Sequence, residues 1–298
     1  MISAKIIADS INPRGTRITT FELEYPRIIH SELMTHRMFS RNSASSRAIP
    51  VAKVIEMVEQ NPAMPVHWGK NQPGMQADSE LDPVSKEAVK QLWLEAARQA
   101  VSIAKIMQQQ GAHKQIVNRI LEPYQWMKVV VTATNYENWF WLRDHKDADP
   151  TIHELASKMK IEYDKSIPIT LKYGEWHLPY VQTGLCKVDD KQIYYDENHD
   201  RITLEQALMI SASCCAQVSY RKSDNSLDKA ETVFKRLIES EPVHASPVEH
   251  QAMCFDNKYY WPQGVTHRDK QGVYHSGNLK DFIQYRQLIE NNSKGSWT

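Results

Sequence analysis

Apolar and polar residues form two patterns along the chain that each predict a β-strand. Residues 17–25 alternate, with Phe21 and Leu23 on one side and Glu22 on the other, which is typical of a half-buried strand. Residues 128–134 are rich in valine and threonine, which favour extended backbone. The pattern therefore predicts two strands that lie far apart in the sequence.

Apolar residues at helical spacing, together with helix-start signals, predict most of the remaining elements. The longest predicted helix begins at Asp82-Pro83 and ends before Gly111. Its predicted apolar stripe consists of Val89, Leu92, Trp93, Ala96, Ala100, Ile103 and Met107. The other predicted helices follow Pro26 and Pro50 or cover residues 116–120, 135–143, 151–166, 203–215, 230–238 and 278–290. Because helices and strands are interspersed without a linker, we expect an α+β fold, with a mixed sheet and several helices, in a single domain over residues 1–298.

The charge balance narrows the class of protein. Lysine plus arginine and aspartate plus glutamate each number 36, so the formal net charge is zero. This argues against a general binder of nucleic acid or of membrane surfaces. No apolar run approaches the roughly 20 residues of a membrane span, and the N-terminus lacks a signal peptide's apolar middle. The four cysteines resemble neither a disulfide framework nor a zinc set, so we expect a reduced, cytoplasmic location.

One polar segment, residues 35–47, carries the strongest chemical signal. It contains three arginines, one histidine, one asparagine and four serines. The planar guanidinium groups of Arg37 and Arg47 match phosphate oxygens. The Ser45 hydroxyl adds a donor, and the Asn42 amide can pair with the edge of a base or ring. The segment is either a solvated polar loop after a helix or one wall of a pocket for a phosphorylated anion, and its density of donors favours the pocket.

The same segment resembles the signature of flavin-dependent thymidylate synthases. That signature reads Arg-His-Arg, two residues, Ser, one residue, Asn, two residues, Ser, one residue and Arg. The matching positions in this chain are His36, Arg37, Ser40, Asn42, Ser45 and Arg47. The chain departs from the family at three nearby positions, where Thr35 replaces arginine, Ser43 replaces glutamate and Glu32 replaces glutamine.

A second segment supports the resemblance. In the family, a strand is followed by a helix that carries asparagine and, five residues later, arginine. This chain has Asn138 and Arg143 after the predicted strand at 128–134. Arg119, which stands shortly before a leucine and a proline, is similar to another nucleotide-binding arginine of the family.

The family's N-terminal motifs are similar to segments near the C-terminus of this chain. Residues 216–219, Ala-Gln-Val-Ser, resemble the family's Ala-Arg-Val-Ser motif. Residues 244–250, His-Ala-Ser-Pro-Val-Glu-His, resemble its His-x-Ser/Thr-Pro-Phe-Glu-His motif. The resemblance therefore implies a circularly permuted chain, in which residues 203–256 supply the family's N-terminal flavin-binding segment. If so, residues 252–255 should lie close to the strand at 17–25.

The resemblance also implies roles for individual residues. The residues expected to bind the substrate nucleotide are Glu32, Ser43, Ser45, Arg47, Arg119 and Arg143. Of these, Ser45 and Arg143 are expected to act in catalysis, by polarising the pyrimidine ring. The residues expected to contact the flavin are His36, Arg37, Asn42, Asn138, Ser219, His244, Ser246 and Glu249.

The activity that the resemblance implies is methylation of deoxyuridylate (dUMP) to thymidylate (dTMP). FAD, NADPH and 5,10-methylenetetrahydrofolate would be required, and the family forms homotetramers with flavin sites between subunits. One alternative is a flavin- and folate-dependent hydroxymethylase of dUMP or dCMP, because the exocyclic amine of cytosine prefers an acceptor such as Glu32. Another is a nonenzymatic nucleotide- or flavin-binding protein.

Two features stay outside this assignment. His244 and His250 are either surface histidines near a helix cap or a metal pair, and a spacing of six residues suits no standard zinc helix, so we expect no metal. Residues 275–286 echo the asparagine, aromatic and arginine spacing of residues 131–143. This echo is a repeat, a further nucleotide contact or a coincidence, and we interpret the segment as an ordinary amphipathic helix.

Overall fold

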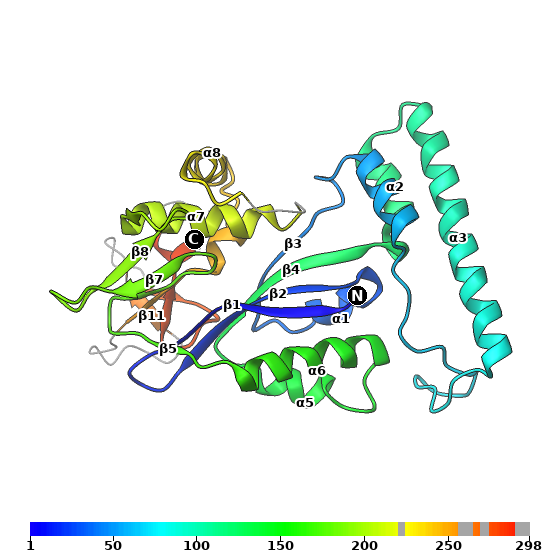
Figure 1. Cartoon of the computed structure of the whole chain (residues 1–298), viewed down its shortest axis with the longest axis horizontal. Coiled ribbons are helices and arrows are strands. Elements are labelled where there is room, and N and C mark those ends of the chain that lie inside the picture. Colours follow the sequence, from blue (N-terminus) through cyan, green and yellow to red (C-terminus); the bar gives the residue numbers. More distant parts are fainter. Residues whose placement is uncertain (220–223, 256–264, 269–273, 290–298) are drawn as a thin grey trace, which may run out of the picture.

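The computed structural model describes residues 1–219, 224–255, 265–268 and 274–289 (Figure 1). These residues form a main sheet with helices on both faces and a helical arm at one end. The predicted α+β class, with a mixed sheet and several helices, is confirmed. No helix in the described ranges is long and apolar enough to cross a membrane.

The main sheet has five strands in the order β3-β4-β2-β1-β5. Neighbouring strands are antiparallel except for β5, which runs parallel to β1. The strands are β1 (Ser3–Ile11), β2 (Arg17–Pro26), β3 (Ser40–Ser43), β4 (Trp126–Ala133) and β5 (Ile169–Thr170), and β2 is joined to β3 through η1 (Arg27–Ile29) and α1 (His30–Met34). Because β2 pairs with β4 from Thr19 to Pro26, both strands predicted from the sequence are confirmed as the centre of the fold.

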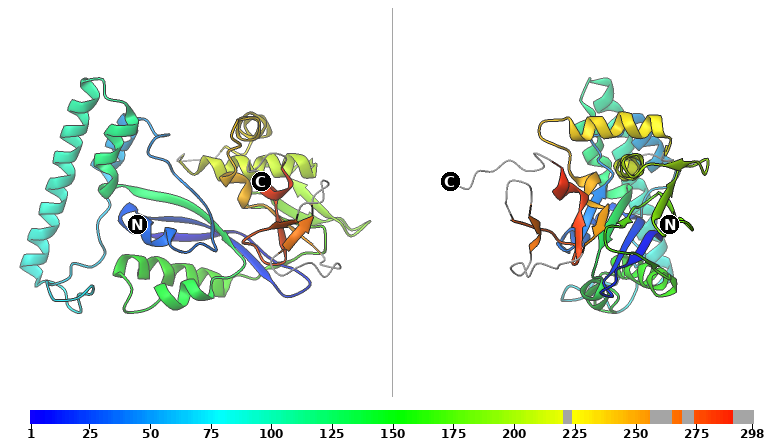
Figure 2. Two further views of the ribbon diagram at one scale, coloured as in Figure 1. Left: turned by 180° about the vertical axis from the view of Figure 1, so that it is seen from behind. Right: turned by 90° about the vertical axis from the view of Figure 1, so that its left-hand side faces the viewer.

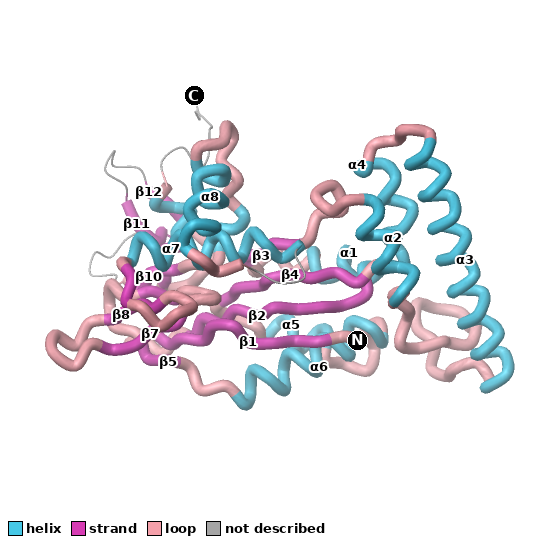
Figure 3. The backbone as a smooth tube through the Cα atoms, turned by 45° about the horizontal axis from the view of Figure 1, so that its top comes forward, coloured by secondary structure: helices cyan, strands magenta, loops and turns pink. Residues whose placement is uncertain are grey.

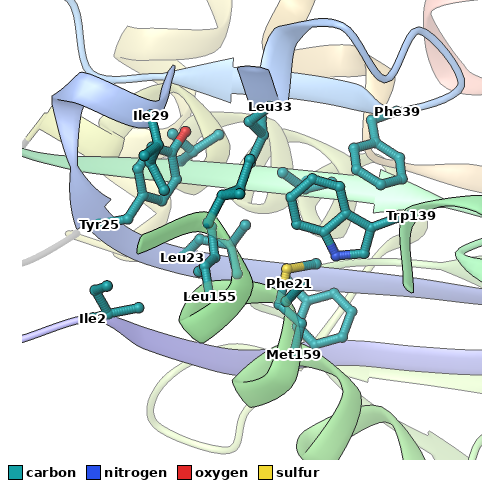
Figure 4. Close-up of a cluster of buried hydrophobic side chains, with 14 of the residues drawn as sticks. Ile2, Phe21, Leu23, Tyr25, Ile29, Leu33, Phe39, Trp139, Leu155 and Met159 are labelled. Atoms are coloured by element: carbon teal, nitrogen blue, oxygen red, sulfur yellow. The ribbon is translucent and has the colours of Figure 1, made fainter. Parts of the chain in front are cut away.

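Two helices, α5 (Glu137–Arg143) and α6 (Pro150–Lys165), cover one face of the main sheet (Figure 3). The alternation of β2 directs Phe21, Leu23 and Tyr25 into this layer, where all three are fully buried (Figure 4). Burial of a large apolar side chain stabilises a fold by roughly 1.5–3 kcal/mol. The period-2 pattern therefore determines which face of the sheet carries the largest core.

A C-terminal layer, built from residues 176–219, 224–255, 265–268 and 274–289, covers part of the opposite face (Figure 2). Its first long helix, α7 (Leu204–Ala216), begins with the predicted capping box: the side chains of Thr203 and Gln206 accept from each other's backbone N–H groups. α8 (Leu227–Ile238) packs on α7. The remaining elements are β6 (Trp176–His177), β7 (Gln182–Leu185), β8 (Gln192–Tyr195), β9 (Arg201–Ile202), η3 (Gln217–Ser219), η4 (Ser246–Glu249), β10 (Ala252–Cys254), β11 (Val265–Arg268), β12 (Tyr274–Ser276), β13 (Phe282–Gln284) and η5 (Tyr285–Leu288).

The C-terminal layer lies against the strand at 17–25, a contact that the resemblance to permuted motifs predicts. Within this layer, β10 pairs with β6 on one side and with β13 on the other. Ile18 of β2 shares a buried apolar cluster with Ala252 and Cys254 of β10. The predicted proximity of residues 252–255 to this strand is therefore confirmed.

A helical arm, residues 51–124, stands at the end of the main sheet away from the C-terminal layer (Figure 2). Asp82 begins its long helix as predicted, because its carboxylate accepts from the backbone N–H groups of Val84 and Ser85. The arm consists of α2 (Val51–Gln60), α3 (Pro83–Gln109), α4 (Lys114–Val117) and η2 (Asn118–Tyr124).

The apolar stripe predicted for α3 is only partly right. The residues that α3 buries with α2 include Ala97, Val101 and Ala104. Leu92 and Ile103, which belong to the predicted stripe, are 69% and 52% exposed. Small side chains allow two helices to approach closely, so the packed face is set by shape rather than by the largest apolar residues.

The helix predicted over residues 278–290 is wrong. Residues 282–284 form β13, which pairs with β10, and η5 follows directly. Asp281 has a φ of +58°, a left-handed conformation that a right-handed helix cannot include. Phe282 and Ile283 are both buried, so their adjacent apolar side chains fill the two sides of a short strand rather than one helix stripe.

A chain of buried polar side chains joins the main sheet to the C-terminal layer. His177 Nδ1 lies 2.9 Å from Ser10 Oγ, and its Nε2 lies 2.8 Å from Thr20 Oγ1. The hydroxyls of Thr20 and Thr132 are 2.7 Å apart, and Thr132 Oγ1 lies 2.8 Å from His250 Nδ1. Burial lowers the pKa of His177 to about 3 and, with the added effect of His177, that of His250 to about 3. Both rings are therefore neutral near neutral pH.

We expect the free energy of unfolding to decrease as the pH falls from about 6.5 to about 4. The unfolded chain takes up protons at its histidines near pH 6.5, whereas His177 and His250 in the folded chain do not. Stability that is fully present above that pH is lost below it, with a slope of up to about 1.4 kcal/mol per pH unit for each buried histidine. Urea unfolding followed by circular dichroism across this pH range measures the slope.

His177→Gln should flatten the slope, while His145→Gln, which changes an exposed histidine, should leave it unchanged. Equal slopes in wild type and His177→Gln would contradict this account of the buried network.

Candidate functional site

The signature segment contains a strand where the sequence predicts the end of a helix followed by a loop. Residues 40–43 form β3, which pairs with β4 and ends the main sheet at one edge. Successive side chains of a strand point to opposite faces. Ser40 and Asn42 therefore face the C-terminal layer, and Arg41 and Ser43 face the side that carries α5. Sequence reasoning missed this strand because its residues lack an apolar alternation, and only the register with β4 reveals it.

Arg143, at the end of α5, brings together three residues around its guanidinium group. Its Nη1 donates to Glu32 Oε2 at 2.9 Å, and its Nε donates to His36 Nε2 at 3.1 Å. Its Nη2 donates to Thr35 Oγ1 at 3.5 Å. Burial, followed by the charges of Arg143 and Arg41, lowers the pKa of His36 to about 4, so the neutral ring can accept on Nε2. Two of the predicted substrate residues and one predicted flavin residue thus form one cluster.

This cluster leaves hydrogen-bonding capacity for a ligand. A guanidinium carries five N–H donors, and Arg143 uses three of them in the bonds just described. Its side chain is 21% exposed, so the remaining donors are within reach of solvent. An arginine held in this way can bind a carbonyl or phosphate oxygen without first being ordered.

Asn42 joins the signature to the segment that the resemblance assigns to flavin binding. Its Nδ2 donates to the carbonyl of Cys215 at 2.6 Å, and its Oδ1 accepts from Ser246 Oγ at 3.0 Å. Both ends of the amide are used, which determines its orientation. The two predicted walls, residues 35–47 and 244–249, therefore lie side by side (Figure 1).

The loop after β3 places further predicted substrate residues near one carboxylate. Glu122 Oε1 accepts from Ser46 Oγ at 2.9 Å and from Arg119 Nη1 at 2.9 Å. Ser45 and Arg47 flank Ser46, and the backbone N–H of Arg47 donates to Ser45 Oγ at 3.3 Å. The side chain of Arg119 is 55% exposed, and Arg47 is exposed, so both guanidinium groups are accessible to an anion.

Four of the residues predicted to contact flavin take no part in these hydrogen bonds. Arg37 and Asn138 are exposed, and their side chains make no hydrogen bond to another residue that the structure describes. His244 is exposed and follows α8 in the chain. Its backbone N–H donates at 2.9 Å to the carbonyl of Leu237, in the last turn of α8. Ser219 ends η3, and its side chain lies outside the described part of the chain.

His250, at the other end of this wall, is fully buried in the polar chain described above, so its interpretation as a surface histidine is wrong. Over the ranges that the structure describes, no group of three or more His, Cys, Asp or Glu residues could hold a metal ion.

Arg286, which the sequence reasoning did not select, pairs with the carboxylate of Glu249. The echo in residues 275–286 is the signal that could have found it.

A groove of about 390 Å³ lies on the helical arm rather than at these residues. It is lined by residues such as Val58, Leu94 and Val101, and by none of the predicted site residues. The candidate site is therefore defined by its donors and charges at the edge of β3.

Comparisons with known proteins bear on this arrangement. The sequence model of the family described as thymidylate synthase complementing protein matches residues 16–169, which include the signature, Arg119, Asn138 and Arg143. No curated protein matches the chain. Solved structures similar to this one include a UMP/dUMP methylase, PolB, from Streptomyces cacaoi, bound with 5-Br UMP and with 5-Br dUMP. Their identities to this chain are 14% and 15%, each with a TM-score of 0.47, and the matches cover 55% of this chain and 89% and 90% of theirs.

Proposed function

The chain belongs to the thymidylate synthase complementing protein family, and on that premise we propose that it methylates dUMP to dTMP. The proposed reaction uses FAD, NADPH and 5,10-methylenetetrahydrofolate. The observation that carries the proposal is the cluster of Glu32, His36 and Arg143 beside the signature strand. It combines a preorganised arginine with a neutral histidine, which is an arrangement suited to an uncharged, carbonyl-bearing ring.

In this proposal the phosphate of the nucleotide binds to the exposed guanidinium groups of Arg47 and Arg119, with the Ser45 hydroxyl as a further donor. Arg143 donates to a carbonyl oxygen of the pyrimidine and stabilises the negative charge that this oxygen carries in the enolate-like form of the ring, whose nucleophilic C5 attacks the carbon donor. Ser43, half-buried at the end of β3, lines the same edge. These residues bind and orient the substrate.

The donor set on the other wall fits a flavin. Ser246 is exposed and its hydroxyl donates to Asn42, His244 two residues earlier is exposed, and Arg37 offers an exposed cation for a pyrophosphate. Glu249 and Asn138 are the remaining proposed contacts. FAD, when bound, supplies the electron transfer that these side chains cannot carry out themselves.

We propose that residues 203–256 take the place of the family's N-terminal flavin-binding segment within a single catalytic domain. The Asn42–Ser246 hydrogen bond and the packing of Ile18 against Ala252 support this permuted arrangement. Cys214 and Cys215 are buried thiols rather than a disulfide, which suits the proposed cytoplasmic location.

A second candidate activity is hydroxymethylation of dUMP or dCMP. The observation that favours it is the carboxylate of Glu32, which uses Oε2 for Arg143 and is 39% exposed. A carboxylate oxygen accepts from the exocyclic amine of cytosine, whereas the uracil carbonyl at that position needs a donor. Glu32 is thus the residue at which the two substrates would be distinguished.

Product mass tests these activities directly. The protein is incubated with FAD, NADPH, methylenetetrahydrofolate and either dUMP or dCMP, and the mass of the nucleotide product is measured by mass spectrometry. We expect dUMP to gain one methyl group. Gain of a hydroxymethyl group would establish the second activity instead, and absence of any gain, without bound flavin, would contradict both. Bound flavin or nucleotide without turnover would indicate a nonenzymatic binding protein.

Variants test the roles of the two walls. Arg143→Ala should lower the rate by about a hundredfold or more and weaken dUMP binding, because it removes a donor to developing charge. His244→Ala should mainly weaken FAD binding. Arg98→Gln, which removes an exposed arginine of the helical arm, is the matched control and should behave as wild type. Similar, small effects of the first two changes would count against the assignment.

We also propose that the protein forms a homo-oligomer, a tetramer as in the resembled family, through the outer face of α3. Val89, Leu92, Ile103 and Ile106 recur at helical spacing and are between 38% and 69% exposed. Large apolar side chains exposed on one long helix are typical of a protein interface.

Light scattering of wild type should therefore give the mass of a tetramer. The double substitution Leu92→Glu and Ile103→Glu should shift it to a smaller species, because charges at an apolar contact are desolvated without partners. A wild-type monomer at micromolar concentration would refute the interface.

A further inference from the structure

The C-terminal strap, residues 278–286, is an integral part of the fold. Its Leu279 and Phe282 are fully buried in the apolar cluster that contains Ile18 of β2. β13 pairs with β10, and Asp281 accepts from Thr16 Oγ1 at 2.6 Å in the turn between β1 and β2. The strap is therefore held in place along its length.

The strap contacts the first residue of the signature strand. Asn278 Nδ2 donates to Ser40 Oγ at 3.0 Å and to the carbonyl of Met38 at 3.0 Å. Gln284 Nε2 donates to the same Ser40 Oγ at 2.8 Å. One buried hydroxyl thus links the strap to β3.

The strap also contacts the opposite wall. Gln284 Nε2 donates to the carbonyl of Glu249 at 2.8 Å, and Arg286 Nη1 pairs with the carboxylate of the same residue. The side chains of Glu249 and Arg286 are 19% and 36% exposed. Burial lowers the pKa of Arg41 on the signature strand, and the nearby negative charge of Glu249 opposes that effect. Glu249 therefore lies within the electrostatic reach of both Arg286 and Arg41.

We infer that Arg286 is a positioning residue of the proposed site, which holds the Glu249 carboxylate in the orientation that flavin binding requires. This inference rests on the proposed function. A largely buried carboxylate is stable only with a partner, so without Arg286 the side chain of Glu249 would turn toward Arg41 or toward solvent. The strap lies outside the family match at 16–169, so this chain uses a segment that the family signature does not supply.

Binding of FAD to single and double variants tests the inference. Dissociation constants come from the change in flavin fluorescence on titration, and the absorption spectrum of the bound flavin is recorded for each variant. Arg286→Gln should weaken binding by about tenfold or more, equivalent to about 1.4 kcal/mol, and should alter that spectrum. Arg286→Lys should recover part of the affinity, because it keeps the charge but loses the planar fork.

Glu249→Gln should have an effect similar to that of Arg286→Gln, and the double variant should be no weaker than either single one, because both act through the same contact. Lys280→Gln removes an exposed cation from the same strap and should bind FAD as wild type. Thermal unfolding of every variant shows whether a loss of affinity merely reflects a loss of fold.

Wild-type affinity in Arg286→Gln, or additive effects in the double variant, would overturn the inference while leaving the proposed function intact. A loss in Lys280→Gln equal to that in Arg286→Gln would also overturn it, since the effect would then belong to the strap as a whole. If wild type binds no FAD, the proposed function fails and this inference fails with it.

Discussion

The pairing of β3 with β4 is the contact on which the rest of the candidate site depends. The strand register directs Arg41 to the carbonyls of Met34 and His36, and directs Asn42 to Cys215 and Ser246 on the other face. A slip of one residue would exchange these faces and separate both sets of contacts. One short backbone ladder thus connects the two halves of the site.

The arginines of the site are held by separate carboxylates. Glu32 binds Arg143, Glu122 binds Arg119, and Glu249 binds Arg286. Each pair lies at a partly exposed surface, where an ion pair contributes modestly to stability, and its value here is to restrict the guanidinium group to one orientation. Arg37 and Arg47 of the signature are exposed and form no ion pair with a carboxylate in the described part of the chain. Their charges leave the region able to attract an anion.

Local patterns predicted much of the fold because their physical causes are local. Alternation identified β2, and the side chains of Asp82 and Thr203 marked helix starts where the structure has them. The failures have nonlocal causes. β3 is a strand only because β4 offers a pairing edge, and the segment after Asp281 is extended because β10 pairs with it.

In the candidate site too, the sequence predicted the residues that belong to local motifs and missed the contacts that depend on tertiary packing. The signature and its resemblance selected Asn42, Arg143 and Ser246, whose contacts with neighbouring predicted residues the structure describes. The spacing of residues 275–286 could point to Arg286 but not to its pairing with Glu249, because that contact arises from tertiary packing. Nor could spacing distinguish the buried His250 from an exposed histidine, since burial depends on residues distant in the sequence.

We propose that residues 35–47 and 244–249 form two walls of one flavin–nucleotide site. A crystal structure of the protein with FAD and dUMP tests it most directly. We expect flavin in contact with both Asn42 and Ser246, and the nucleotide in contact with Arg143. Flavin bound elsewhere, or contacted by only one of the two walls, would contradict it.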